Sequence, residues 1–150
     1  MLVYRITHKK FSDKLIGSGI ENRWNMSGQF VIYSSANKAM ACLENLVHTS
    51  AETLRRDLYV CMEIFIPETA EVTVITLKDL PENFTDEEQK IITQSTGSKW
   101  YTDNKNLLLK VPSAIISSEN NFIINTMHED FKKVKINGRE PFSFDKRLRG

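Results

Sequence analysis

Three residues of types that act on nucleotides follow one another at short intervals in the first third of the chain. Arg23 lies in a polar loop, Tyr33 in a β-branched and aromatic run, and Glu44 in a segment with helical periodicity, at intervals of 10 and 11 residues. An arginine can grip phosphate oxygens bidentately, because its planar guanidinium stays charged at any working pH. A diphosphate held by Arg23, a flat ring against Tyr33 and a carboxylate near a sugar carbon would suit cleavage of a dinucleotide glycosidic bond. The spacing permits this geometry but does not require it.

Each of these residues also has an ordinary structural interpretation. A loop arginine is commonly a solvated charge, and a strand tyrosine commonly packs in the core. Glu44 lies at the margin of the apolar face of its predicted helix, where a half-buried carboxylate needs either a partner or a function. His48 is four residues further on and would supply that partner in a helix-surface ion pair. Trp24 is expected to anchor its loop on the core.

Other kinds of site find little support in the sequence. His8, His48 and His128 stand apart without metal-ligand spacing, and neither Cys42 nor Cys61 has a nearby partner, so we expect no metal. The glycine fingerprints of the Rossmann and P-loop nucleotide sites are missing, as is the G-x-S-x-G motif of serine hydrolases. A nucleotide would therefore bind through another architecture.

The overall composition predicts one globular domain spanning residues 1–150. With 20 basic and 19 acidic side chains the net charge is +1, which argues against direct binding of nucleic acid. The two cysteines lie in apolar runs and fit buried free thiols in a reducing compartment. No stretch resembles a signal peptide or a membrane span, so we expect a cytoplasmic protein.

Strand-like runs outnumber helical ones and occur in clusters, which predicts an α+β fold. The predicted strands are 2–6, 30–35, 58–66, 71–77, 107–111, 121–125 and 132–136. Two helices are predicted, over 36–54 and 84–95. The second opens with Thr85 and Glu88 at capping-box spacing.

Six motifs, taken in order, resemble the sequence pattern of the RES-domain family. They are VYRI (3–6), RWN-x-x-G (23–28), VIYSS (31–35), LENLVH (43–48), LLLKVPSAI (107–115) and ENNFIINTMHEDF (119–131). The closing PFSFDKRL (141–148) resembles the family's C-terminal strand, so the resemblance covers residues 3–148. Two departures stand out: Asn22 replaces a common glycine, and Thr126 replaces the proline of the family's NP-x-H. Asn tolerates a left-handed backbone better than most residues, so the Asn22 turn is expected to survive.

The resemblance implies an ADP-ribosyltransferase-like fold, a split mixed β-sheet with flanking helices and a cleft for NAD. The family's arginine, glutamate and serine map onto Arg23, Glu44 and Ser113, and its strand tyrosine maps onto Tyr33. Arg23, Glu44 and Tyr33 are then the expected catalytic residues. Arg23, Tyr33, Ser113 and Asn125 are expected to bind the nucleotide. Alternatively, Ser113 caps the turn after its proline, and Asn125, like Asn121, is a turn former.

The resemblance also implies a function: the toxin of a type II toxin–antitoxin system that cleaves the nicotinamide–ribose bond of NAD by hydrolysis or phosphorolysis, without a metal. The alternative is transfer of ADP-ribose from NAD to a cellular protein. The resemblance implies an Xre-like helix-turn-helix antitoxin as partner, and any DNA contact would come from this antitoxin. It also implies a toxin homodimer within the toxin–antitoxin complex, and inorganic phosphate as a further ligand. A non-catalytic binding module is disfavoured because both Arg23 and Glu44 are present.

Overall fold

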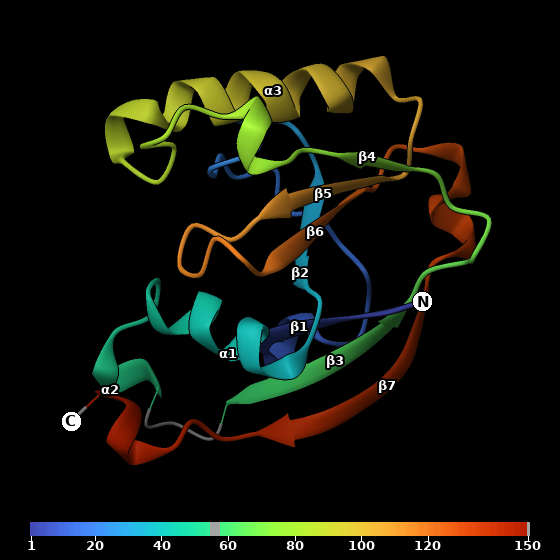
Figure 1. The fold of residues 1–150 in the computed structure, drawn as a ribbon. Coiled ribbons are helices and arrows are strands. Elements are labelled where there is room, and N and C mark those ends of the chain that lie inside the picture. Colours follow the sequence, from blue (N-terminus) through green and yellow to red (C-terminus); the bar gives the residue numbers. More distant parts are fainter. Residues whose placement is uncertain (55–57, 150) are drawn as a thin grey trace.

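Seven strands form one mixed sheet in the order β4-β5-β6-β2-β1-β3-β7 (Figure 1). The structure is a computed structural model that describes residues 1–54 and 58–149. The strands are β1 Leu2–His8, β2 Val31–Ser35, β3 Tyr59–Phe65, β4 Val72–Val74, β5 Leu108–Pro112, β6 Asn120–Asn125 and β7 Lys135–Phe142. β4 and β5 run parallel, and the other neighbours are antiparallel. The predicted α+β fold with a split mixed sheet is confirmed.

The split lies between β1 and β2, in the middle of the sheet. β1 pairs with β3 from Leu2 opposite Phe65 to His8 opposite Tyr59, along its whole length. Between β1 and β2, by contrast, the register has one pair, Tyr4 opposite Ser35. The strands of the two halves, β4-β5-β6-β2 and β1-β3-β7, therefore diverge on either side of this seam.

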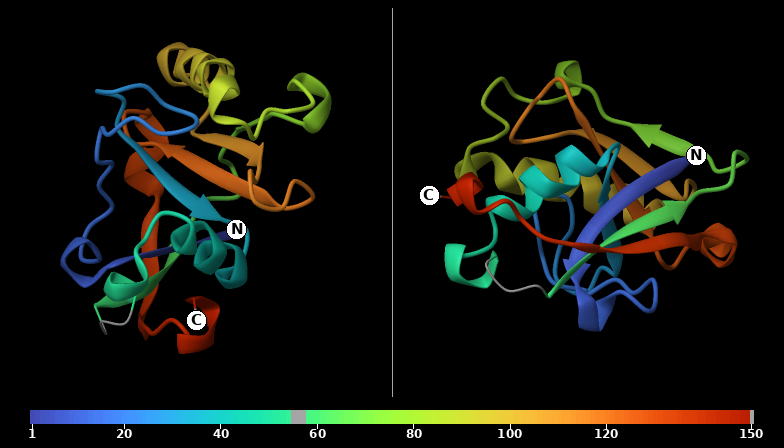
Figure 2. Two further views of the ribbon diagram at one scale, coloured as in Figure 1. Left: turned by 90° about the vertical axis from the view of Figure 1, so that its left-hand side faces the viewer. Right: turned by 90° about the horizontal axis from the view of Figure 1, so that it is seen from below.

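Two helices, α1 and α3, cover different halves of the sheet. α1 Lys38–Leu46 packs on β1 and β2, α2 Ala51–Leu54 is one short turn, and α3 Lys90–Asp103 lies over the β5–β6 half (Figures 1 and 2). Short 3-10 turns complete the chain: η1 Lys9–Phe11, η2 Leu77–Asp79, η3 Glu87–Gln89, η4 Glu129–Lys133 and η5 Lys146–Arg149.

The hydrophobic core is divided in the same way on the face of the sheet that carries the helices, but not on the opposite face. On the opposite face, residues of both halves pack in a common cluster that includes Val3, Ile32, Met62 and Ile124. On the side of the helices there are two clusters. One joins Trp100 of α3 to β5 and β6, and the other joins α1 to β1 and β3. The space between these two clusters is where a cleft can form.

Both predicted helices differ from the observed ones. The helix predicted over 36–54 is two, because α1 ends at Leu46 and the His48 N–H turns back to the carbonyl of Asn45 at 3.1 Å. The start of α1 is fixed by Asn37, whose side chain accepts from the Met40 N–H at 2.9 Å. The helix predicted over 84–95 begins at Lys90 and extends to Asp103.

The capping box predicted at Thr85 was wrong. Neither the N-cap residue of η3 nor that of α3 makes a side-chain capping hydrogen bond. The Thr85 carbonyl accepts instead from an arginine of a distant loop, and this contact holds the segment outside the helix. A tertiary contact has thus displaced the local capping signal.

The last strand also begins later than predicted. Residues 129–133 form η4, opened by His128, whose Nδ1 accepts from the Asp130 N–H at 3.1 Å. β7 then runs from Lys135 to Phe142, and only the first two residues of the closing 141–148 segment belong to it. Both cysteines are free thiols. Cys61 is buried as predicted, whereas Cys42 is only half-buried, and burial raises the pKa of both.

Candidate functional site

A cavity of about 650 Å³ opens on the helix side of the sheet, next to the seam. Its walls come from β1, the loop before β2, β2 itself, α1, the ends of β5 and β6, and the segment that leads into α3. Its lining includes Arg5, Arg23, Tyr33, Ser35, Glu44, Thr85, Glu87, Lys90 and Asn121. A volume of this size is in the range of small-molecule and cofactor sites.

Glu44 reaches the cavity from the middle of α1. Ala41 and Leu46 of this helix are buried against β1 and β3, and this packing leaves Glu44 half-buried at the edge of the contact. Its Oε1 accepts two hydrogen bonds, from Ser113 Oγ at 2.8 Å and from Asn121 Nδ2 at 2.5 Å. Within residues 1–54 and 58–149, Oε2 accepts no hydrogen bond. One oxygen is therefore fixed, and the other is available to a bound molecule.

The ion pair between Glu44 and His48 is not formed. α1 ends before His48 is reached, so the two side chains do not share a helical face. The carboxylate finds its partners across the seam instead.

Ser113 has the capping role that was the alternative prediction, and it also contacts Glu44. The residue follows β5, is fully buried, and its hydroxyl oxygen accepts from the backbone N–H groups of Ile115 at 3.0 Å and Ile116 at 3.2 Å. Since both N–H groups point at this oxygen, the hydroxyl proton is directed to Glu44. Ser113 thus caps the turn after its proline and, with the same hydroxyl, binds the carboxylate.

Asn121 is the second donor to Glu44, whereas the sequence-based prediction places Asn125 in the site. It lies at the start of β6 opposite Ser35, whose hydroxyl donates to Asn121 Oδ1 at 2.8 Å. This bond fixes the amide with its NH₂ group toward Glu44. Ser35, Asn121 and Glu44 therefore form a continuous hydrogen-bonded chain.

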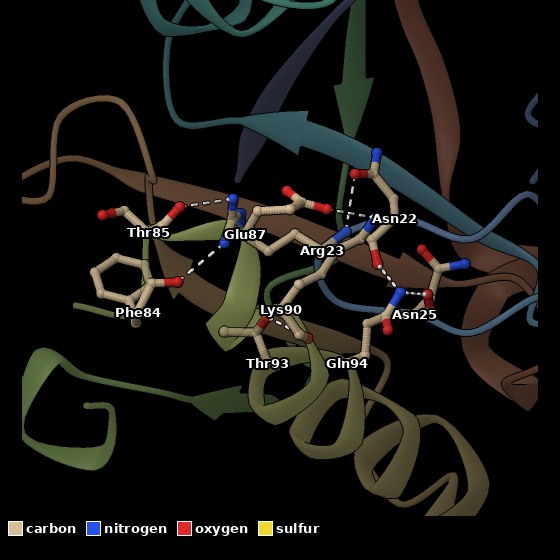
Figure 3. Close-up of polar contacts among 9 residues, drawn as sticks. All are labelled: Asn22, Arg23, Asn25, Phe84, Thr85, Glu87, Lys90, Thr93 and Gln94. Atoms are coloured by element: carbon tan, nitrogen blue, oxygen red, sulfur yellow. Dashed lines mark hydrogen bonds and ion pairs between the residues drawn. The ribbon is translucent and has the colours of Figure 1, made fainter. Parts of the chain in front are cut away.

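Arg23 lies in a tight turn between Asn22 and Asn25, whose backbones bond to each other at 3.1 and 3.4 Å. Its guanidinium donates to the carbonyls of Phe84 at 2.9 Å and Thr85 at 3.0 Å (Figure 3). Both acceptors are neutral, so these two bonds leave the positive charge uncompensated. Arg23 therefore ties the 84–85 segment to the cavity wall and keeps its charge.

Helix α3 packs against this turn. Gln94 donates to the carbonyls of Asn22 at 3.0 Å and Asn25 at 3.5 Å. One turn further on, Gly97 allows the Trp24 carbonyl to approach so closely that a Cβ on Gly97 would lie 1.9 Å from its oxygen. Trp24 is buried against the core, as expected of a loop anchor.

Tyr33 lines the cavity but uses its hydroxyl within the protein. The oxygen accepts from the Trp24 N–H at 3.0 Å and donates to Asn25 Oδ1 at 2.8 Å. Burial raises the pKa of Tyr33 well above its ordinary value, so the phenol stays neutral at physiological pH. Its hydroxyl aligns the Arg23 turn, which leaves the ring for contact with a ligand.

Asn125 is not part of this cavity. It is fully buried at the opposite end of β6 from Asn121, where Nδ2 donates to Asn104 Oδ1 at 2.9 Å and Oδ1 accepts from the Met127 N–H at 2.9 Å. The structure therefore brings Arg23, Tyr33, Glu44 and Ser113 to one site and leaves Asn125 outside it.

Sequence reasoning missed two cationic residues of the cavity wall, Arg5 and Lys90. Arg5 has one long bond, to the Ile16 carbonyl at 3.5 Å, and burial lowers its pKa. A charged residue within the apolar run of β1 was the available signal for it. Lys90 gave no signal, because the element that presents it to the cavity was predicted with the wrong start.

Across 1–54 and 58–149, no group of three or more His, Cys, Asp or Glu side chains is placed to hold a metal ion. In the same part of the chain, no helix has the length and apolar character needed to cross a membrane.

Comparison with known folds gives a structural neighbour over nearly the whole chain. The fold matches a chain of the crystal structure of the M. tuberculosis MbcT-MbcA toxin-antitoxin complex with a TM-score of 0.75 and 16% sequence identity. The match covers 98% of this chain and 85% of that one. At this identity the likeness concerns the fold.

Comparison of sequences identifies the family. The RES domain model matches residues 2–145. A Prs ADP-ribosylating toxin from Sphingobium sp. is 33% identical over 91% of this chain and 88% of its own length. Two proteins named Toxin Res, from Photorhabdus laumondii and Yersinia enterocolitica, are 32% and 30% identical over 99% of this chain and over 97% and 100% of their own lengths. The chain therefore belongs to the RES-domain toxin family.

Proposed function

We propose that this protein is the toxin of a toxin–antitoxin pair and degrades NAD by cleaving the bond between nicotinamide and ribose. The observation that carries the proposal is the arrangement of Glu44. Its carboxylate is held at the cavity through one oxygen by Ser113 and Asn121, while the other oxygen remains available. Such a fixed anion is what this reaction requires.

Cleavage develops positive charge on the sugar. The C1′–N bond breaks, and nicotinamide leaves as a neutral molecule with the bonding electron pair, so C1′ acquires oxocarbenium character. Water or a phosphate oxygen then forms the new bond to C1′, and in hydrolysis the proton of the water passes to solvent. A preorganised carboxylate near C1′ stabilises this charge, as in glycoside hydrolysis.

The other wall residues suit the remaining parts of NAD. Arg23 and Arg5 fit the diphosphate, because a half-buried cation without an anionic partner among the described residues gains from an anionic ligand. The Tyr33 ring offers a surface for a flat ring, and Ser113 holds Glu44 in place. NAD enters here as the substrate, and the proposed reaction needs no metal.

A second candidate function is transfer of ADP-ribose to a protein side chain. It is favoured by the relative from Sphingobium, whose name describes an ADP-ribosylating toxin. Both reactions would begin with the same bond cleavage at Glu44 and would differ in the nucleophile that attacks C1′.

The proposed partner is an Xre-like antitoxin that keeps the toxin inactive. The support comes from the structural neighbour, which was solved as a toxin–antitoxin complex. A toxin homodimer within that complex, and a bacterial cytoplasm as the place of action, remain predictions from the family resemblance.

The decisive experiment follows NAD by NMR with purified protein, with and without phosphate. We expect release of nicotinamide by the wild type and a loss of about 10²–10³-fold in Glu44→Gln, which keeps the shape of the side chain but removes its charge. Glu88→Gln, at an exposed position outside the cavity, is the matched control. Products that require phosphate would indicate phosphorolysis. Intact NAD with the antitoxin-free wild type would refute degradation, and label from NAD appearing on a protein would then favour transfer.

A further inference from the structure

We propose that Arg23 and Lys90 together form a binding subsite for a phosphate group, and that Glu87 competes with the phosphate for this subsite. The inference rests on the proposed function, which supplies two phosphate groups of this chemistry: the diphosphate of NAD and inorganic phosphate. It adds a second cation and a built-in competitor to the site described above.

The first cation, Arg23, lacks an anionic partner among the described residues. Its guanidinium carries five N–H donors, and its hydrogen bonds go to two backbone carbonyls, of Phe84 and Thr85. These bonds hold the planar group against the cavity wall without neutralising its charge. The side chain is thus preorganised to bind an anion.

The second cation, Lys90, lies in the first turn of α3 and also lines the cavity. A cation is disfavoured at this end of a helix and an anion is favoured, because the helix dipole is positive there. In Figure 3 the Lys90 side chain extends away from α3 toward Asn22 and Arg23. The charge of Lys90 therefore adds to the attraction that Arg23 and the first turn of α3 already exert on an anion in this part of the cavity.

The register of α3 is what brings these two cations together. Lys90, Gln94 and Gly97 follow one another at helical spacing on one face, and Gln94 and Gly97 are the residues that contact the Arg23 turn. Since Lys90 shares this face, its side chain is directed to the same turn. Arg23 and Lys90, 67 positions apart in the sequence, are thus positioned by a single packing contact.

Glu87 is the carboxylate that lies next to Lys90, and its ion pair with Lys90 is weak. Its Oε1 lies 3.5 Å from Lys90 Nζ, longer than a charge-assisted hydrogen bond, and its side chain is 80% exposed. An exposed pair of this kind contributes little to stability. Inorganic phosphate, and the diphosphate taken as a whole, carry more charge and more acceptor oxygens than a carboxylate, so we expect either to displace Glu87 from Lys90.

Calorimetric titration with two probes tests the subsite without any turnover. The probes are inorganic phosphate and ADP-ribose, which carries the diphosphate but no nicotinamide. We expect Lys90→Gln to weaken binding of at least one probe about tenfold and Glu87→Gln to strengthen the same probe about two- to threefold. Lys99→Gln, on the exposed side of the same helix and outside the cavity, is the control and should change neither.

The probe that responds identifies the ligand. A response to phosphate alone assigns the subsite to the attacking phosphate, and a response to ADP-ribose assigns it to the substrate diphosphate. Affinities for both probes that are equal in Lys90→Gln and Lys99→Gln would overturn the proposal, and so would weaker binding in Glu87→Gln. The opposite signs expected for the two substitutions exclude simple misfolding. NAD cleavage that still depends on Glu44 would show that only the subsite, and not the proposed function, had failed.

Discussion

Ser113 Oγ donates a hydrogen bond to Glu44 Oε1 at 2.8 Å and so joins the end of β5 to α1 across the seam of the sheet. The serine hydroxyl is itself oriented by two backbone N–H groups, those of Ile115 and Ile116. Its proton is therefore directed at the carboxylate before any ligand binds. Such preorganisation lowers the cost of placing a charge beside a developing cation.

Ser113→Ala should lower kcat by about 10–100-fold with little change in KM, because a hydrogen bond to a charged group contributes about 1.5–3 kcal/mol. The carboxylate would keep its bond from Asn121 but lose its fixed orientation. Steady-state NAD cleavage checks this, with the exposed Ser118→Ala as control. An increase in KM at unchanged kcat would instead place Ser113 in ground-state binding.

Gly97→Ala tests whether α3 positions Arg23. A methyl group at this position would meet the Trp24 carbonyl oxygen at 1.9 Å, so either the helix or the Arg23 turn must move. We expect a loss of about 1–3 kcal/mol in the free energy of unfolding, as for other overpacked sites, together with a higher KM for NAD. Urea denaturation and kinetics measure the two effects, with Ser95→Ala on the exposed face of α3 as control. A stable variant with wild-type KM would show that the turn does not depend on this contact.

Most of the strands could be predicted from the sequence because their alternation reflects burial on the two faces of a sheet. The parts that failed depend on contacts between distant segments. Helix α3 begins at Lys90 and not at the capping signal of Thr85, because the Thr85 carbonyl accepts a hydrogen bond from Arg23. Glu44 is paired by Ser113 and Asn121 rather than by the nearby His48, since α1 ends too early.

Residue type suggests Arg23, Tyr33 and Glu44 as site residues, and the family resemblance adds Ser113. Arg23, Tyr33, Glu44 and Ser113 reach the same region, but the role of the Tyr33 hydroxyl depends on a bond to the backbone of Trp24 that no spacing rule reveals. The choice between Asn121 and Asn125 likewise depends on which end of β6 borders the cavity.

Tyr33→Phe gives a pH-dependent prediction. At pH 7 the variant should lose about 1–3 kcal/mol, because the Trp24 N–H and Asn25 Oδ1 lose their partner. Burial raises the pKa of Tyr33 in the folded protein, so the phenol loses its proton more readily in the unfolded chain, at about pH 10. The stability that Tyr33 contributes is thus complete below this pH and declines above it.

The measurement is urea denaturation of the wild type and Tyr33→Phe from pH 7 to 10.5. We expect a constant difference in unfolding free energy up to about pH 9, followed by a smaller difference as the pH passes 10. All other ionisable groups are the same in the two proteins and cancel in the comparison. A difference that grows at alkaline pH would contradict burial of the phenol.

Asn125→Ala separates a structural asparagine from one that serves the site. Asn125 is fully buried away from the cavity, and its amide links Asn104 at the end of α3 to the Met127 backbone. Its removal should lower the free energy of unfolding by about 1–3 kcal/mol, because buried polar groups lose their partners. The kcat and KM of the folded fraction should remain those of the wild type. Asn121→Ala should show the reverse, a lower kcat with a smaller loss of stability, because Asn121 is only half-buried and its NH₂ group donates to Glu44. If Asn125→Ala raised KM for NAD while the protein stayed folded, the nucleotide would extend beyond this cavity toward the far end of β6.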